Sequence, residues 1–239
     1  MKCVGIVGGL GPETTAEFYL NLVRRFRSSS YIYPSIVIDN VSFPFHLERD
    51  IIQNSVNEGK MLPYIIKSIK RLNDSRVDFI AMPCNTIHVF IEELRRESTV
   101  PILSILDKTI ESVRNNGHKK IGLLATTKTI ESKLYETPLK NSGIETIIPR
   151  KKEQNKVAEI ILRTLEGRAL NQDRNLIEKI IKNLGDRGSE AILLGCTDLS
   201  LIVKKDIGID ILDSTEILLE SVFREMMGFD KKAIKNKHR

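Results

Sequence analysis

The chain has 239 residues, of which 41% are hydrophobic and 28% charged, a composition that suits a soluble globular protein of one or two domains. No apolar run approaches the roughly 20 residues that span a bilayer, and Gly8, Gly9 and Gly11 interrupt the N-terminal apolar run too early for a signal peptide, so we expect a cytoplasmic protein that binds no membrane. The net charge is +6, but subtracting the five positive charges of the tail 231–239 leaves +1 for residues 1–230, and with 5% aromatic residues and no Trp this argues against a nucleic-acid partner.

The first half of the chain alternates short apolar runs, typical of buried strands, with stretches of helical periodicity. The expected strands cover residues 3–9, 35–41, 78–83 and 100–105. One expected helix begins near Pro12, and three more cover about 48–73, 85–97 and 106–116. The longest of them places Ile65, Ile69 and Leu72 on one face, which predicts a helix packed against a sheet.

The second half repeats this scheme. The expected strands cover residues 119–126, 145–149, 190–195 and 209–213. The expected helices cover 129–143, 153–166, 172–185, 198–205 and 214–227, and the last opens after Asp213, a good N-cap residue. Strands that are nearly all apolar and separated by helices predict an α/β fold with mostly parallel sheets covered by helices on both faces.

Two pairs of segments indicate an internal repeat. "GIVGGLGPET" at 5–14 is similar to "GLLATTKTIE" at 122–131, which begins 117 residues later. "DFIAMPCNT" at 78–86 is similar to "EAILLGCTD" at 190–198, which begins 112 residues later. Two segments of an α/β protein can resemble each other by chance, but the Cys shared by the second pair favours two related halves. We therefore expect two similar, pseudo-twofold-related domains with a site between them, formed by residues 1–112 with a returning segment 214–239, and by residues 113–213.

The three cysteines have different expected roles. Cys3 lies within the first predicted strand and is interpreted as core filler. Cys84 and Cys196 each follow a predicted strand, at the edge where open parallel sheets bind ligands. No Cys/His cluster has zinc spacing, so we expect no metal site, and a disulfide would be unusual in the cytosol. Two interpretations remain for Cys84 and Cys196, namely core filling and catalysis. Their equivalent positions after two similar strands favour catalysis.

Two thiols on opposite walls of one cleft suit proton transfer at a stereocentre. One thiolate removes a proton from one face of the carbon, and the opposite thiol delivers a proton to the other face. Near-attack distances of about 3–3.5 Å would place the sulfurs roughly 7 Å apart, whereas a disulfide needs about 2 Å. We expect backbone N–H groups and helix dipoles after each Cys to hold a substrate carboxylate and to lower the pKa of each thiol from about 8.5 toward neutrality.

The segments "GIVGGLGPETTAEFY", "MPCNTIH", "GLLATTKT" and "LLGCTDLSLI", in this order and spacing, resemble the aspartate/glutamate racemase superfamily, most closely its aspartate racemase branch. The resemblance runs from about residue 3 to about residue 225. It implies an aspartate racemase that uses no cofactor and no metal, and that forms a homodimer. It also implies that Cys84 and Cys196 are the two bases. The substrate-binding residues that it implies are Arg49, Asn85, Thr86, Thr126 and Thr197.

Two positions depart from the pattern of that superfamily. Glu166 stands where relatives often have a Lys, which weakens the case for an acidic substrate. Asp198, two residues after the second Cys of the pair, stands where relatives often have a Glu. Three alternatives therefore stay open: a racemase of glutamate, a neutral amino acid, or a cyclic or dicarboxylic acid; a non-catalytic amino-acid-binding relative; and a thiol redox protein.

Three further features have both a structural and a functional interpretation. His88 lies four residues after Cys84 and could orient the thiolate or serve as a structural histidine. "GGLGP" lacks the Lys-Ser/Thr of a P-loop and the full glycine spacing of a dinucleotide site, so we interpret it as a tight turn that lets the backbone approach a small ligand. Arg49 has a surface ion pair as its alternative to substrate binding.

Overall fold

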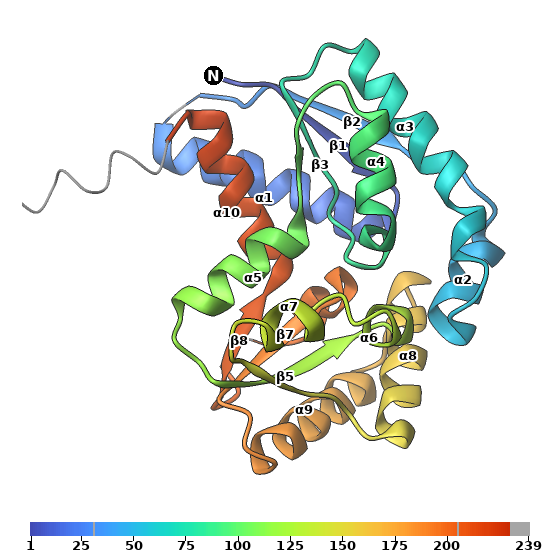
Figure 1. The fold of residues 1–239 in the computed structure, drawn as a ribbon, viewed down its shortest axis with the longest axis vertical. Helices are drawn as coiled ribbons and strands as arrows, with labels where there is room; N and C mark the ends of the chain where they lie inside the picture. Colours follow the sequence, from blue (N-terminus) through green and yellow to red (C-terminus); the bar gives the residue numbers. More distant parts are fainter. Residues whose placement is uncertain (31, 205, 230–239) are drawn as a thin grey trace, which may run out of the picture.

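The computed structural model describes residues 1–30, 32–204 and 206–229 and contains two four-stranded sheets (Figure 1). The first sheet has the strand order β2-β1-β3-β4, and all its neighbouring strands run parallel. Its strands are β1 (Val4–Gly8), β2 (Ile36–Asn40), β3 (Phe79–Ala81) and β4 (Ile102–Leu103). Every residue of the central strands β1 and β3 is buried, as expected for a sheet covered on both faces.

The second sheet has the order β6-β5-β7-β8 and is also fully parallel. Its strands are β5 (Lys120–Ala125), β6 (Glu145–Ile147), β7 (Ala191–Gly195) and β8 (Asp210–Asp213). Counted from the first strand of each half, the two sheets have the same order, second-first-third-fourth. The predicted α/β class with two similar parallel sheets is confirmed, while the domain boundaries stay a prediction. The basic tail 231–239 lies outside the described residues.

The prediction of one helix over 48–73 is wrong, because the chain breaks there into three pieces. These are α2 (Phe45–Asn54), the 3₁₀ segment η1 (Glu58–Lys60) and α3 (Leu62–Asp74). Ser55 ends α2 in the left-handed conformation, with φ of 57°, and Asn57 follows with φ of 65°. Pro63 then lies in the first turn of α3, where its missing N–H costs no helical hydrogen bond.

Three other predicted helices are shorter or tighter than expected. The segment 85–97 begins as the 3₁₀ segment η2 (Thr86–Phe90) and continues as α4 (Ile91–Glu97). In the described part of the last segment, 198–204, the helical residues belong to the 3₁₀ segment η3 (Thr197–Leu201). The segment 129–143 divides into α6 (Thr127–Glu131) and α7 (Glu136–Lys140), because Lys133 adopts a positive φ of 51° between them. Two further helices of the second half are α8 (Lys151–Leu165) and α9 (Asn171–Asp186).

The helix α10 (Ser214–Met227) packs against α1 (Pro12–Ser30) and α5 (Ile105–Asn115). As predicted, Asp213 caps α10: its Oδ1 accepts a hydrogen bond from the N–H of Thr215 at 2.9 Å. Phe223 of α10 meets Phe26 of α1 edge to face, with 4.9 Å between ring centroids. The C-terminal helix therefore returns to the first half of the chain.

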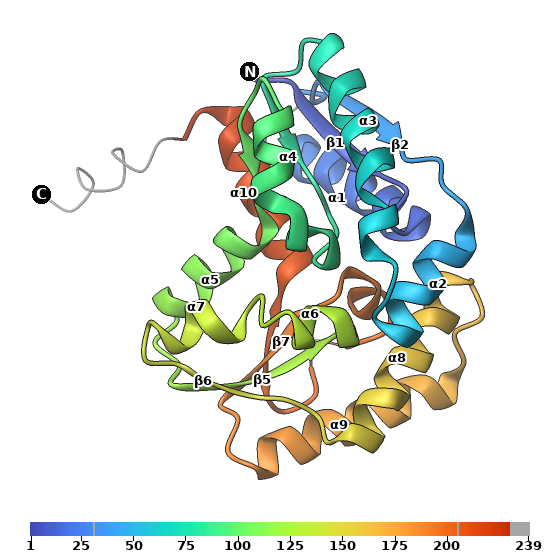
Figure 2. The ribbon, with the colours of Figure 1, turned by 45° about the vertical axis from the view of Figure 1, so that its right-hand side comes forward.

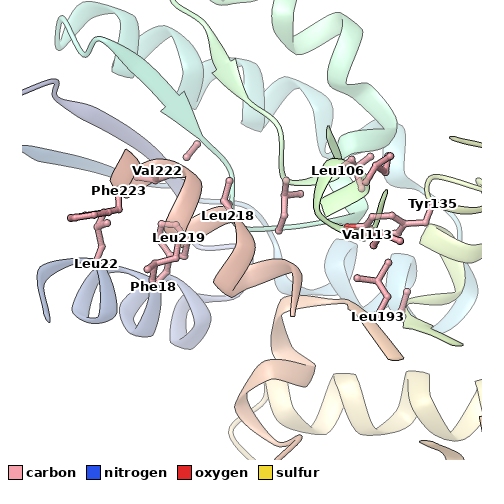
Figure 3. Close-up of a cluster of buried hydrophobic side chains, with 14 of the residues drawn as sticks. Phe18, Leu22, Leu106, Val113, Tyr135, Leu193, Leu218, Leu219, Val222 and Phe223 are labelled. Carbon is pink, nitrogen blue, oxygen red and sulfur yellow. The ribbon is translucent and has the colours of Figure 1, made fainter. Parts of the chain in front are cut away.

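One buried apolar cluster connects the two sheets beside these helices. It extends from Phe18 of α1 through Leu218 of α10 to Leu193 of β7 (Figure 3). On another side of the molecule, α2 of the first half packs against α8 of the second (Figure 2). The two halves thus meet along a continuous core and along a helix pair. Across residues 1–30, 32–204 and 206–229, no helix is both long and apolar enough to cross a bilayer.

Candidate active site

A cavity that is partly open to solvent is lined by residues of both halves. Six of the seven predicted site residues line it, namely Cys84, Asn85, Thr86, Thr126, Cys196 and Thr197. Arg49 is the predicted residue that does not. The cavity therefore brings both thiols and the polar residues beside them to one place.

The two cysteines occupy equivalent positions in the two sheets. Cys84 follows β3 after Met82 and Pro83, and Cys196 follows β7 directly. Pro83 has no N–H for a strand ladder, which is why the strand ends there, and the N–H of Cys84 donates to the carbonyl of Met82 at 2.8 Å. Because β3 and β7 are the third strands of matching sheets, both thiols lie at a carboxyl edge that faces the cavity. A sulfur separation of roughly 7 Å stays a prediction.

The resting thiols are neutral, contrary to the prediction that their pKa values lie near neutrality. Burial raises the pKa of Cys84 to about 12, and the nearby carboxylates of Glu48 and Asp198 raise it too, while backbone N–H groups lower it. Burial and then Asp198 raise the pKa of Cys196 well above its ordinary value. Removing a thiolate from water costs more than the few N–H groups of η2 and η3 return, so desolvation decides the direction.

Asp198 connects the second thiol to the first half of the chain. Its Oδ2 lies 3.7 Å from Cys196 Sγ, and its Oδ1 accepts a hydrogen bond from the hydroxyl of Thr14 in α1 at 2.9 Å. Burial raises the pKa of Asp198 to about 6, although both hydrogen bonds lower it. A carboxyl group that titrates near neutral pH therefore touches one of the two thiols.

Three threonine hydroxyls from the two halves meet at the cavity wall. Thr86 Oγ1 lies 2.9 Å from Thr126 Oγ1 and 3.2 Å from Thr129 Oγ1. Thr126 also caps α6, because its hydroxyl accepts the N–H of Thr129 at 3.2 Å. Because a hydroxyl group rotates about its C–O bond, those of Thr86 and Thr126 can turn a hydrogen toward a carboxylate. Thr197, which follows Cys196 in the chain, is buried and also lines the cavity.

Asn85 joins both halves behind Cys84. Its side-chain nitrogen donates to Ser214 Oγ of α10 at 3.1 Å, and its oxygen accepts a hydrogen bond from the hydroxyl of Tyr135. Asn85 is 2% exposed and Tyr135 fully buried, so this network is shielded from water. Both ends of the amide already have protein partners, and the network fixes the backbone that carries the thiol. Substrate contact by Asn85 stays a prediction.

Arg49 lies in a surface ion pair, which was its alternative interpretation. Its Nη2 is 3.3 Å from Glu166 Oε1, and its guanidinium lies over the ring of Phe45 at 5.4 Å from the centroid. Arg168 pairs with the other oxygen of the same carboxylate. The Arg49 side chain is 49% exposed, and its charge is compensated by the residue that departs from the superfamily pattern.

Glu48, one residue before Arg49, also lines the cavity and was not among the predicted site residues. Burial raises the pKa of Glu48 to about 8, and the charges of Asp198 and Glu13 add to this effect. The spacing of Glu48, Ile51 and Ile52 indicates that they share one face of a helix. Ile51 and Ile52 line the cavity as well.

His88 supports the backbone of Cys84 and not its sulfur. Its Nδ1 lies 2.8 Å from the carbonyl oxygen of Cys84, and since a carbonyl only accepts, Nδ1 carries the hydrogen. Burial lowers the pKa of His88 to about 4, so the ring is neutral at physiological pH. The structural interpretation of this histidine is therefore the one that the geometry supports.

The "GGLGP" segment forms a turn that brings the backbone close to the other half. A Cβ at Gly9, where φ is 83°, would lie 2.7 Å from Asn40 Oδ1. A Cβ at Gly11 would lie 3.0 Å from Leu165 Cδ1 and 3.3 Å from Asp198 Oδ1, both from cavity-lining residues. Within the described residues, no group of three or more His, Cys, Asp or Glu side chains is arranged to hold a metal ion.

The chain is similar to known amino-acid racemases along nearly its whole length. The broad-specificity amino-acid racemase RacX of Bacillus subtilis (strain 168) is 28% identical over 232 residues, which cover 95% of this chain and 99% of that protein. The structure of Picrophilus torridus aspartate racemase has a TM-score of 0.81 at 26% identity, with 95% of each chain covered. An aspartate racemase homologue from Pyrococcus horikoshii OT3 has a TM-score of 0.77 at 28% identity, covering 95% of this chain and 100% of that one.

The match to a protein family is equally extensive. The family described as Asp/Glu/Hydantoin racemase matches residues 7–222, a range that contains both cavity thiols. The matching sheets, the paired cysteines and this coverage agree with one another. The chain belongs to the Asp/Glu/hydantoin racemase family.

Proposed function

We propose that the protein racemises a free amino acid without a cofactor, using Cys84 and Cys196 as acid–base groups on opposite walls of the cavity. The observation that carries this proposal is that both thiols follow the third strand of matching sheets and line one cavity. Membership of the racemase family supports the reaction class and the amino-acid substrate.

The reaction needs one sulfur as a thiolate and the other as a thiol. The thiolate removes the α-proton from one face of the substrate, and the opposite thiol gives its proton to the other face. One S–H and one C–H bond break while one of each forms, so the configuration inverts and the two sulfurs exchange protonation states. The reverse reaction starts from that exchanged state.

A bound substrate brings a positive charge that favours the thiolate form of a neighbouring cysteine. The α-ammonium group of a zwitterionic amino acid beside a thiolate stabilises the charged form and lowers the thiol pKa. Asp198 Oδ2, 3.7 Å from Cys196 Sγ, is placed to accept the hydrogen of that thiol. The hydroxyls of Thr86 and Thr126 offer donors to the α-carboxylate on the other wall.

Aspartate is the substrate that the sequence resemblance implies, and similarity to the Picrophilus torridus aspartate racemase supports it. Similarity to RacX, which is described as having broad specificity, supports a wider range of side chains. We therefore propose racemisation of an amino acid as the function, and aspartate as one substrate to be tested.

The predicted homodimer is checked by light scattering of the purified protein.

The proposal is tested by incubating the protein with single L-amino acids in deuterated water, followed by chiral chromatography and proton NMR. We expect the D-enantiomer to form with deuterium at Cα. Cys84→Ala and Cys196→Ala should each lower racemisation by about 10²- to 10⁴-fold, the usual contribution of a positioned acid or base. Cys3→Ala is the matched control, because Cys3 is not among the residues lining the cavity.

Three outcomes would contradict the proposal in different ways. Full racemisation by either cavity variant would exclude the two-thiol mechanism. Amino-acid binding without exchange at Cα would support a binding protein that has kept the fold. A disulfide between the two cavity cysteines after mild oxidation, with no exchange, would support a redox protein.

A further inference from the structure

The cavity walls combine apolar side chains with carboxyl groups. Leu10, Ile51, Ile52, Met61 and Leu165 form apolar surface, and Glu48 and Asp198 contribute the acidic groups. Among the residues that the structure describes, no Lys, Arg or His lines the cavity. Asp198 already bonds Thr14 and Cys196, so Glu48 is the carboxyl group that is available to a substrate side chain.

Two cations that are sequence neighbours of cavity-lining residues, Arg49 after Glu48 and Lys128 near Thr126, are already paired with carboxylates. Arg49 pairs with Glu166, whose carboxylate also bonds Arg168. Lys128 of α6 pairs with Glu58 of η1 at 2.5 Å. A second carboxylate on the substrate would lie among acidic groups, and at pH 8, where most of Asp198 and about half of Glu48 are ionised, like charges at close range are unfavourable.

We propose that this racemase acts on amino acids with an aliphatic stem and a cationic end, such as lysine or ornithine, and that Glu48 binds the cationic end. The inference rests on the proposed racemase function and specifies its substrate class. Glu48, Ile51 and Ile52 share one face of α2, so a carboxylate and apolar surface lie side by side where such a side chain would extend.

The protonation of Glu48 is consistent with this assignment. Its pKa is raised to about 8 because burial and the charges of Asp198 and Glu13 disfavour the carboxylate. An ammonium or guanidinium group in the cavity would supply the missing positive charge and restore the ionised form. The cavity lining is therefore short of positive charge at the position where a basic side chain would bring one.

The experiment compares kcat/KM for Cα-deuterium exchange across L-lysine, L-ornithine, L-norleucine, L-aspartate and L-glutamate at pH 8. Norleucine has the stem of lysine without the ammonium group, so their ratio isolates the cationic end. We expect lysine to exceed norleucine at least tenfold, and both to exceed aspartate, as a charged hydrogen bond typically contributes about tenfold or more. Glu48→Gln should lower the lysine-to-norleucine ratio about tenfold, and Glu48→Asp should retain part of it.

Glu17→Gln is the matched control, because Glu17 lies on α1 with its side chain 48% exposed and outside the cavity. Exchange with aspartate or glutamate ahead of lysine would overturn the substrate class while leaving the racemase function intact. An unchanged lysine-to-norleucine ratio in a folded Glu48→Gln protein would overturn the role of Glu48. The absence of exchange with every amino acid would overturn the proposed function itself, and this inference with it.

Discussion

Replacing Glu48 by Gln should change how the stability of the protein depends on pH. The ordinary pKa of this carboxyl group is 4.5, and in the folded protein it is about 8. Between these values the folded state binds more protons than the unfolded state, so the free energy of unfolding falls as pH rises. Gln has no proton to lose, and the variant should lack this part of the decline.

The size of the effect follows from the two pKa values. Between pH 5 and pH 8.5 they correspond to a ceiling of about 4 kcal/mol. Glu48 is only partly buried, so water screens its charge and about 2 kcal/mol is a realistic expectation. When the pH is raised across this range, the free energy of unfolding of Glu48→Gln should therefore rise by about 2 kcal/mol relative to that of the unsubstituted protein.

Urea unfolding of both proteins at pH 5 and pH 8.5 measures this difference, and Glu17→Gln serves as the exposed-carboxylate control. Because the comparison is a double difference, other groups that titrate in the same range, such as Asp198, cancel to first order. An equal stability difference between the two proteins at both pH values would show that the pKa of Glu48 is not raised, and would refute the reasoning.

Three further predictions concern the site and the core. Tyr135→Phe should lower the free energy of unfolding by about 1–3 kcal/mol in urea titrations, because it leaves the buried Asn85 oxygen without its donor; no loss would mean that the bond contributes little. The kcat/KM of racemisation should rise between pH 6 and pH 8.5, because the pKa of Cys84 is raised to about 12 and the thiolate fraction grows with pH; a flat profile would contradict neutral resting thiols. Leu218→Ala should cost about 2–5 kcal/mol by the same unfolding assay, since Leu218 is fully buried in the cluster that connects the sheets; a cost below 1 kcal/mol would show that the site collapses around the substitution.

The sheets and the thiol pair could be predicted from sequence because both depend on local patterns. Short apolar runs between helices specify buried parallel strands. The same local sequence, an apolar strand followed by Cys and polar residues, recurs at Cys84 and Cys196. Equivalent strands in matching sheets place equivalent residues at the same edge, so the recurrence translates directly into a shared cavity.

The rest depends on contacts between distant parts of the chain. Arg49 is neutralised by Glu166, which is 117 residues away, and no local pattern shows which charges will meet. The direction of the thiol pKa depends on how completely the assembled cavity excludes water. The break after α2 depends on left-handed conformations at Ser55 and Asn57, which the apolar periodicity of the segment does not show.

The two halves match in fold but not in charge, and this difference has a consequence for the two enantiomers. Two residues after Cys196 the chain has the carboxyl group of Asp198, whereas the equivalent position after Cys84 is Thr86. The L- and D-forms of an amino acid have equal free energy in water, so a racemase must have the same kcat/KM for both. The unequal walls therefore cannot favour one direction at equilibrium. They can only make one enantiomer bind more tightly and turn over correspondingly more slowly than its mirror image.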